Sequence, residues 1–167
     1  ITVLALALVP LTQATAQDVV FTNPGSTPGF GTAAVIFSDI DGGGLADVAI
    51  STVDAAGGQG IVYCMSSETG AALQDTFWLP GDFGAAMLNV CDVLGGPTDD
   101  LLVLWPFGGL AFLYPGDLVG GSGVMTPQLI QLPSSAAGEM VLLADLDGSG
   151  TRDVAIGRAD VQFFSTR

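Results

Sequence analysis

The nine residues at 39–47, Asp-Ile-Asp-Gly-Gly-Gly-Leu-Ala-Asp, recur at 145–153 as Asp-Leu-Asp-Gly-Ser-Gly-Thr-Arg-Asp. A more divergent copy at 92–100 lies midway, so the three copies start 53 residues apart. In the ungapped alignment of residues 30–50 with 136–156, nine of 21 positions are identical. A fixed period of about 50 residues is typical of propellers and arrays, in which each repeat buries its apolar face against its neighbours.

Short apolar runs between Gly, Pro, Asp and Ser residues predict about four strands per repeat. The expected strands are 33–38, 47–51, 60–65 and 72–79, then 87–90, 101–104, 110–114 and 128–132, then 140–144, 154–156 and 161–164. Helices find little support, because no 3.6-residue apolar pattern persists and 24 glycines with 9 prolines interrupt the chain. The prediction is an all-β fold of β-propeller blades, each of four antiparallel strands, with about three repeats of 53 residues forming a partial propeller. A β-sandwich also has short strands, but it gives no reason for aspartates at a constant interval.

The start of the chain differs from the rest. Residues 1–10 are apolar, and Ala14-Thr15-Ala16 is a small-x-small cleavage pattern, so we interpret residues 1–16 as a signal peptide remnant without its initiating Met. An uncleaved anchor is the alternative, although the run is short for a bilayer span. We therefore expect a secreted protein, extracellular, periplasmic or at the cell surface, with no stable membrane insertion of the mature chain. The repeats then cover residues 17–70, 71–123 and an incomplete 124–167.

The charge of the chain limits its partners. The net charge is −14, with 17 acidic residues against three arginines, and neither Lys nor His occurs. Phosphate contacts need Lys and Arg, so nucleic acid and anionic lipid are not expected partners, whereas cations are. The lack of His also argues against nucleophilic triads and His-ligated zinc sites.

The two cysteines, Cys64 and Cys91, do not make a disulfide framework. Cys91 aligns with Ser38 and Ala144, a small position in an expected inner strand, which predicts a buried free thiol. A bridge between neighbouring repeats is the alternative.

The aspartates of the first and third loops have the spacing of a calcium site. Ca²⁺ prefers six to eight oxygen ligands at about 2.4 Å, which carboxylates at alternate positions of a tight turn can supply with a main-chain carbonyl. In the first loop the expected ligands are Asp39, Asp41, Asp47 and the carbonyl of Leu45, with water at Gly43. In the third loop they are Asp145, Asp147, Ser149, Asp153 and the carbonyl of Thr151.

The other interpretations of these loops differ in strength. Asp and Gly also dominate tight turns that bind no metal, so the aspartates could be turn formers only. An EF-hand is excluded, because an apolar strand follows the loop and no Glu stands at position twelve. The middle copy keeps Asp92 and Asp100 but has Leu94 at position three and Pro97 in place of a glycine, so we expect it to bind no metal.

Phe30-Gly31 and Phe83-Gly84 precede the first two loops, whereas the third copy has Ala136-Ala137 there. With the acidic loops, these residues make residues 21–167 resemble the FG-GAP or VCBS-type repeats of integrin-α-like β-propellers. Only Pro106 remains of the Gly-Ala-Pro that closes that pattern. The resemblance implies structural Ca²⁺, a protein or carbohydrate ligand on one face of a closed ring, and further blades in a longer chain or by association.

The expected function is therefore that of a calcium-stabilised binding or adhesion module, with no catalytic or cofactor-binding residue and no enzyme activity of its own. The alternative is the scaffold of an extracellular polysaccharide-degrading enzyme whose catalytic residues lie elsewhere. A carboxylate pair could hydrolyse a glycoside, but nothing distinguishes the spare acids Asp75, Asp82, Asp99 and Asp117. The aromatic residues Tyr63, Trp78 and Tyr114 are expected in inter-blade packing, and Trp105-Pro106-Phe107 is the best candidate for an exposed binding patch.

Overall fold

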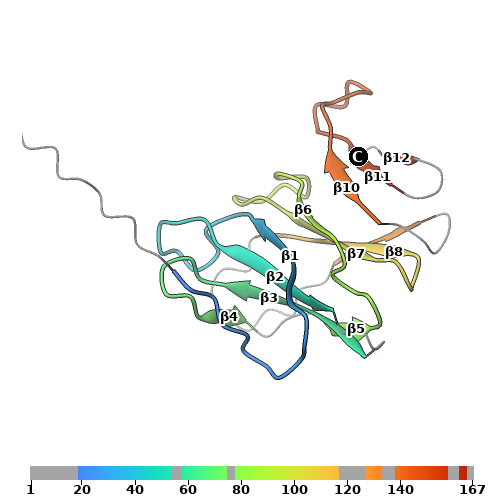
Figure 1. Ribbon diagram of the computed structural model, residues 1–167. Coiled ribbons are helices and arrows are strands. Elements are labelled where there is room, and N and C mark those ends of the chain that lie inside the picture. Colours follow the sequence, from blue (N-terminus) through green and yellow to red (C-terminus); the bar gives the residue numbers. More distant parts are fainter. Residues whose placement is uncertain are drawn as a thin grey trace, which may run out of the picture.

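The computed structural model describes residues 19–53, 58–74, 78–116, 127–132, 138–157 and 162–164. Within these ranges the chain forms twelve strands in three antiparallel sheets and no helix, so the all-β prediction is confirmed (Figure 1). Accordingly, no helix in the described part of the chain is long and apolar enough to cross a membrane. The expected signal peptide remnant, residues 1–16, lies outside the described residues.

Within each sheet the strands follow one another in chain order. The first sheet consists of β1 (Phe30–Ile36), β2 (Val48–Val53), β3 (Gln59–Met65) and β4 (Ala72–Gln74), with β5 (Trp78–Pro80) also paired to β3. The second consists of β6 (Met87–Asn89), β7 (Leu101–Trp105), β8 (Leu110–Tyr114) and β9 (Gln128–Gln131). The third consists of β10 (Met140–Leu142), β11 (Val154–Ile156) and β12 (Gln162–Phe164). The strand expected over 72–79 is thus divided in two, because β4 pairs with the end of β3 and β5 with its start.

The first two strands of each sheet pair at equivalent positions. Val35 pairs with Ala49, Leu88 with Leu102, and Val141 with Ala155. The three aspartate loops therefore connect strands at the same point of each sheet. The first sheet ends at Pro80 and the second begins at Met87, which agrees with the expected grouping of strand 72–79 with the first repeat and strand 87–90 with the second. The repeat boundary itself was expected earlier, at residue 70.

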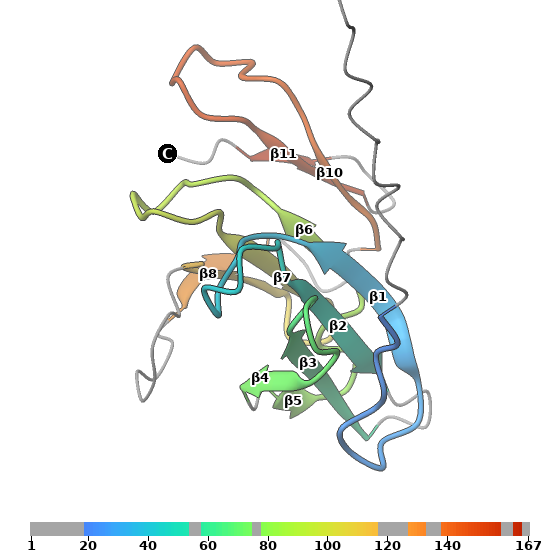
Figure 2. The ribbon, with the colours of Figure 1, turned by 90° about the vertical axis from the view of Figure 1, so that its left-hand side faces the viewer.

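The three sheets stack in chain order, as Figure 2 shows. Alternate residues of β7 enter different interfaces, so this strand is buried on both faces and has a continuous apolar sequence. The first interface contains Phe37, Ile40, Ala49, Val62, Cys64, Phe83, Leu101, Val103, Phe112 and Tyr114. The second contains Val90, Leu102, Leu104, Ala111, Leu113, Leu132, Val154 and Ile156. The described residues do not close a ring, so a complete propeller remains a proposal.

The two cysteines are free thiols. Cys64 is buried in β3, and burial, with a smaller contribution from Asp47, raises the pKa of its thiol to about 12. The prediction of a buried strand position was wrong for Cys91, which is partly exposed just after β6 and has a φ of 62°. The Cys91 N–H donates to the Asn89 side-chain oxygen, and the Cys91 carbonyl accepts a hydrogen bond from the Asp100 N–H. Cys91 therefore begins the loop instead of extending the strand.

Candidate metal centres

The first loop is closed by main-chain hydrogen bonds at the ends of β1 and β2. Phe37 N–H donates to the Asp47 carbonyl at 3.0 Å, and Asp47 N–H donates to the Ser38 carbonyl at 2.9 Å. Between these bonds the chain turns through Gly42 and Gly44, whose φ values of 78° and 91° are ones that other residues rarely adopt. The sequence Asp-Gly-Gly-Gly therefore turns the chain tightly enough to bring its flanking aspartates together.

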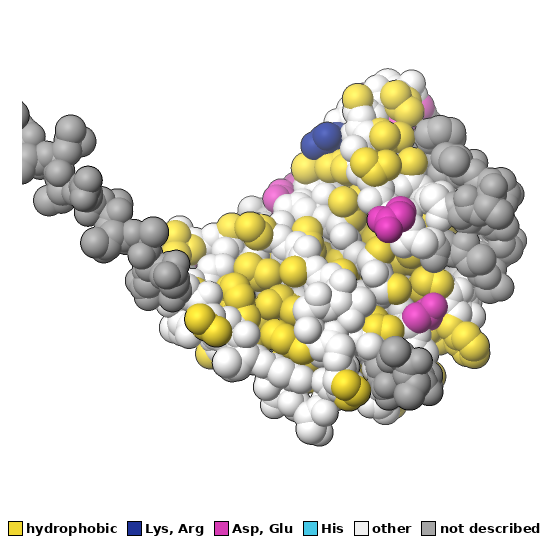
Figure 3. All heavy atoms as spheres, viewed as in Figure 1, with side chains coloured by type: hydrophobic (Ala, Val, Ile, Leu, Met, Phe, Trp, Pro, Cys, Tyr) yellow, Lys and Arg dark blue, Asp and Glu magenta, His cyan; other side chains and the backbone are white. Residues whose placement is uncertain are grey.

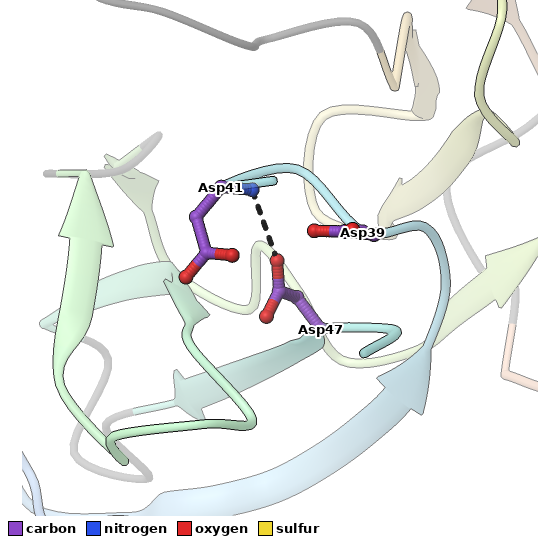
Figure 4. Close-up of side chains that lie close together, drawn as sticks. All are labelled: Asp39, Asp41 and Asp47. Carbon is purple, nitrogen blue, oxygen red and sulfur yellow. Dashed lines mark hydrogen bonds between the residues drawn. The ribbon is translucent and has the colours of Figure 1, made fainter. Parts of the chain in front are cut away.

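Three carboxylates surround one small space in this loop (Figure 4). Asp39, Asp41 and Asp47 each offer a carboxylate oxygen, and these oxygens lie within 4.8 Å of one another. Asp47 is buried, Asp39 is half-buried and Asp41 is exposed. Like charges at such distances repel one another, so the cluster needs a cation or hydrogen-bond donors nearby.

Main-chain N–H groups supply part of that compensation. Asp47 Oδ2 accepts from Ile40 at 2.9 Å and from Asp41 at 3.3 Å (Figure 4), and Asp47 Oδ1 accepts from Ser67 at 2.9 Å. The two Asp39 oxygens accept from Gly42 and Gly44 at 2.8 Å each. These donors hold the carboxylates in place and leave their remaining lone pairs available for a cation.

A hydrogen bond from the Ser66 side chain lowers the pKa of Asp41, and the Gly43 N–H adds to this effect. Both favour the charged form, which is the form that binds a cation.

Sequence reasoning missed a fourth carboxylate, that of Glu68, which follows β3. A Cβ built on Gly43 would lie 2.9 Å from both Asp41 Oδ1 and Glu68 Oε2. The Glu68 carboxylate therefore lies where a side chain at Gly43, the fifth position of the loop, would lie, and where we expected a water ligand. No signal within the loop identifies Glu68, because only the pairing of β3 with β2 brings it there.

The third loop contains an equivalent cluster. Carboxylate oxygens of Asp145, Asp147 and Asp153 lie within 4.8 Å of one another. The Ser149 N–H donates to Asp145 and Asp147 at 3.0 and 2.9 Å, and the Ser149 and Thr151 hydroxyl oxygens are 2.9 Å apart. The structure thus brings together the three predicted acidic ligands and Ser149. The carbonyls of Leu45 and Thr151 stay predicted ligands.

Asp153 differs from Asp47 and Asp100, which hold the same position in the other two loops, in the hydrogen bonding of one carboxylate oxygen. Asp153 is 4% exposed, and its Oδ2 accepts from Leu146 N–H at 2.7 Å, but its buried Oδ1 has no hydrogen-bond partner among the described residues. The corresponding oxygen of Asp47 accepts from Ser67, two residues after β3, and that of Asp100 accepts from Gly116, two residues after β8. The residue two after β12 lies outside the described chain. A buried carboxylate oxygen without a partner is costly, and a bound cation would remove that cost.

Main-chain N–H groups hold both aspartates of the middle loop. Asp100 Oδ2 accepts from Val93 and Leu94 at 2.7 Å, and its Oδ1 accepts from Gly116 at 3.1 Å. Asp92 Oδ1 accepts from the next two glycines of the loop. Leu94 stands where the other loops have a carboxylate. The expectation that this loop binds no metal stays a prediction.

The spare acids have structural contacts or lie outside the described chain. Asp82 accepts from Phe107 N–H at 2.8 Å, and Asp99 accepts from the Asn89 side chain at 2.9 Å. Asp75 and Asp117 lie outside the described residues.

The aromatic patch expected at residues 105–107 is divided. The Trp105 ring packs against Phe112 and its indole N–H donates to the Pro80 carbonyl at 2.8 Å, whereas Phe107 is exposed. Tyr114 packs in the first interface as expected, whereas Tyr63 is buried in a cluster of the first sheet itself. Trp78, which we expected in packing, is exposed.

The donor set of the two clusters fits a hard cation. All predicted ligands are oxygens, and thiol and imidazole ligands are absent from both loops. The buried Asp153 Oδ1 has no partner in the part of the chain that the structure describes. Either cluster could therefore hold a metal ion.

The chain matches none of the protein-family models and none of the curated proteins with which it was compared. The resemblance to FG-GAP and VCBS-type repeats thus rests on the acidic loops and the Phe-Gly pairs of the sequence.

Proposed function

We propose that the protein is a secreted, calcium-stabilised β-propeller segment that acts as a binding or adhesion module for protein or carbohydrate. The observation that carries the proposal is that two loops at equivalent places in two sheets each gather three carboxylates, one of them buried. Three carboxylates held this close repel one another, so each cluster is better explained by a bound cation than by a turn that binds no metal.

Calcium is the cation that the loops favour. Mg²⁺ demands near-ideal octahedral geometry and retains water, whereas Ca²⁺ tolerates irregular sets of carboxylate, hydroxyl and carbonyl oxygens. In the first site Asp39, Asp41 and Asp47 would hold the ion, with Glu68 beside them. In the third loop Asp145, Asp147 and Asp153 would hold it, with Ser149 beside them.

The ion would be structural. It would supply positive charge that cancels the repulsion within each cluster. At the first site it would also connect the loop with the turn after β3, because Asp47 already accepts from Ser67 of that turn. A loop held in this way keeps the ends of β1, β2 and β3 in a fixed arrangement on which a binding surface can be built.

Isothermal titration of the protein with Ca²⁺ tests the metal assignment. We expect two sites for the wild-type protein, one for the Asp145→Asn/Asp147→Asn variant, and two for the Asp92→Asn control. Equal loss in the variant and the control, or no heat with the wild-type protein, would contradict it.

Binding is tested on immobilised polysaccharides and extracellular proteins, with Ca²⁺ and with EDTA. We expect calcium-dependent retention on one class of ligand without release of reducing ends. Release of reducing ends by the purified chain would contradict the binding-module proposal and favour hydrolysis of the polysaccharide.

A further inference from the structure

A hydrogen bond joins the first loop to the middle loop, which belongs to the next sheet. The Ser38 hydroxyl oxygen accepts from the Asp99 N–H. Ser38 precedes Asp39, the first expected metal ligand, and Asp99 precedes Asp100, the buried aspartate of the middle loop. The two loops are therefore in direct contact across the first interface.

Asn89, the last residue of β6, extends this contact. Its side-chain NH₂ group donates to Asp99 Oδ2 at 2.9 Å and to the Ile36 carbonyl at 3.3 Å, and its side-chain oxygen accepts from the Cys91 N–H at 2.8 Å. β1 and β6 lie side by side, as Figure 2 shows. One amide thus connects the end of β1 with the end of β6 and with the middle loop. We call Ser38, Asn89 and Asp99 the polar link.

The polar link acts on the half of the first loop that carries its first two expected ligands. The Ser38 carbonyl accepts from the Asp47 N–H at 2.9 Å, so Ser38 is bonded to a predicted ligand by its main chain and to the second sheet by its side chain. Ile40, which lies between Asp39 and Asp41, is 6% exposed in the first interface. The position of the first loop therefore depends on the second sheet as well as on its own turn.

The first loop needs such support because it concentrates negative charge. Figure 3 shows only scattered acidic side chains on the face drawn there, whereas the first loop has three carboxylates with oxygens within 4.8 Å of one another. Without an ion, their repulsion favours conformations in which the carboxylates move apart. Contacts that oppose this movement raise the fraction of molecules ready to bind a cation, and the affinity rises by the same factor.

The second interface is built with other side chains at the equivalent positions. These positions, 53 residues further along the chain, hold Cys91, Leu142 and Arg152. The Leu142 side chain cannot form hydrogen bonds and packs in the apolar cluster of the second interface. The Arg152 Nε–H donates to the Leu143 carbonyl of its own sheet at 3.0 Å. The polar link is therefore not needed to stack two sheets, which leaves the first loop as the element that it serves.

We propose that the polar link couples cation binding at the first loop to the packing of the second sheet. The inference rests on the proposed function, because it takes Ca²⁺ as the ligand of the first loop. The polar link holds the first loop in its binding conformation and so raises its affinity. Because coupling between two sites is reciprocal, a bound ion in turn stabilises the first interface and restrains the middle loop. One cation thus fixes two sheets.

Titration of the first loop alone is the first test, in the Asp145→Asn/Asp147→Asn background. We expect Ser38→Ala and Asn89→Leu, which introduce the residue types of the third repeat at these positions, to weaken Ca²⁺ binding about three- to tenfold. Cys91→Ala makes the equivalent change one repeat later and is the matched control, for which we expect unchanged affinity. Ser38→Ala removes a single hydroxyl group and is the decisive variant.

Hydrogen exchange of the Asp99 N–H, followed by NMR, is the second test and does not depend on the measured affinity. We expect saturating Ca²⁺ to slow this exchange about threefold or more in the wild-type protein. We expect no slowing in Ser38→Ala, which lacks the acceptor, or in Asp39→Asn/Asp41→Asn, which lacks two ligands of the first loop. Slowing that persists in Asp39→Asn/Asp41→Asn would indicate an ion at the middle loop and would overturn the proposal.

The remaining outcomes separate this coupling from the proposed function. Unchanged affinity in Ser38→Ala, an equal loss in Cys91→Ala, or an Asp99 exchange rate that Ca²⁺ does not alter would each overturn the coupling. Ca²⁺ binding at two sites would then still support the proposed function. Absence of Ca²⁺ binding to the wild-type protein would contradict both.

Discussion

Replacing Asp153 by asparagine separates a metal ligand from a turn former. Asparagine keeps an oxygen for the Leu146 N–H and removes a buried charge beside Asp145 and Asp147. In EDTA we expect the free energy of unfolding to change by less than about 1 kcal/mol, because the oxygen that is replaced has no hydrogen-bond partner among the described residues.

In Ca²⁺ the same substitution should be clearly destabilising. A site occupied at 100 times its dissociation constant stabilises the folded state by about 2.7 kcal/mol, which corresponds to about 5–10 °C in Tm for a chain of this size. Asp153→Asn should lose most of that contribution from the third loop. Urea unfolding in Ca²⁺ and in EDTA, followed by circular dichroism, measures both free energies.

Asp100→Asn of the middle loop is the control. Both oxygens of Asp100 accept main-chain N–H groups, so an amide must turn its NH₂ toward a donor. We expect a loss of about 1–3 kcal/mol that is the same with and without Ca²⁺. The reasoning is refuted if Asp153→Asn behaves like Asp100→Asn, with equal losses in both solutions.

Three further predictions concern single side chains. Glu68→Gln should weaken Ca²⁺ binding at the first site, which titration in the Asp145→Asn/Asp147→Asn background isolates; unchanged affinity would show that Glu68 is not a ligand. Ser66→Ala should raise the pKa of Asp41, which NMR titration without Ca²⁺ follows. Because the folded-state pKa of Asp41 is lowered, its stabilising contribution is present above the ordinary carboxyl pKa of about 4 and is lost as pH falls through the folded value. With iodoacetamide, mass spectrometry should find Cys91 alkylated before Cys64, whose buried thiol has its pKa raised to about 12; the reverse order would contradict the burial of Cys64.

Most of the strands could be predicted because the signals for them are local. Apolar runs between Gly and Pro marked β2, β7 and β11 within a few residues of their observed ends. The sequence interval also predicted which strand pairs are equivalent. It did not predict that the last expected strand of the first sheet divides into β4 and β5, because that division depends on the pairing of β5 with the start of β3.

The conformation of the candidate metal loops is also determined largely by their local sequence. Asp39 and Asp145 bind N–H groups within five residues, and the intervening glycines permit the turn, so nine residues suffice to gather three carboxylates. Only the tertiary structure brought Glu68 beside Gly43 and left one oxygen of Asp153 without a partner within the described ranges. Only the stacking of sheets buried Ile40 and left Leu146 exposed, although both hold the same position of the same loop. The physical reason is that hydrogen bonds within a turn depend on neighbouring residues, whereas burial depends on which distant strands pack against them.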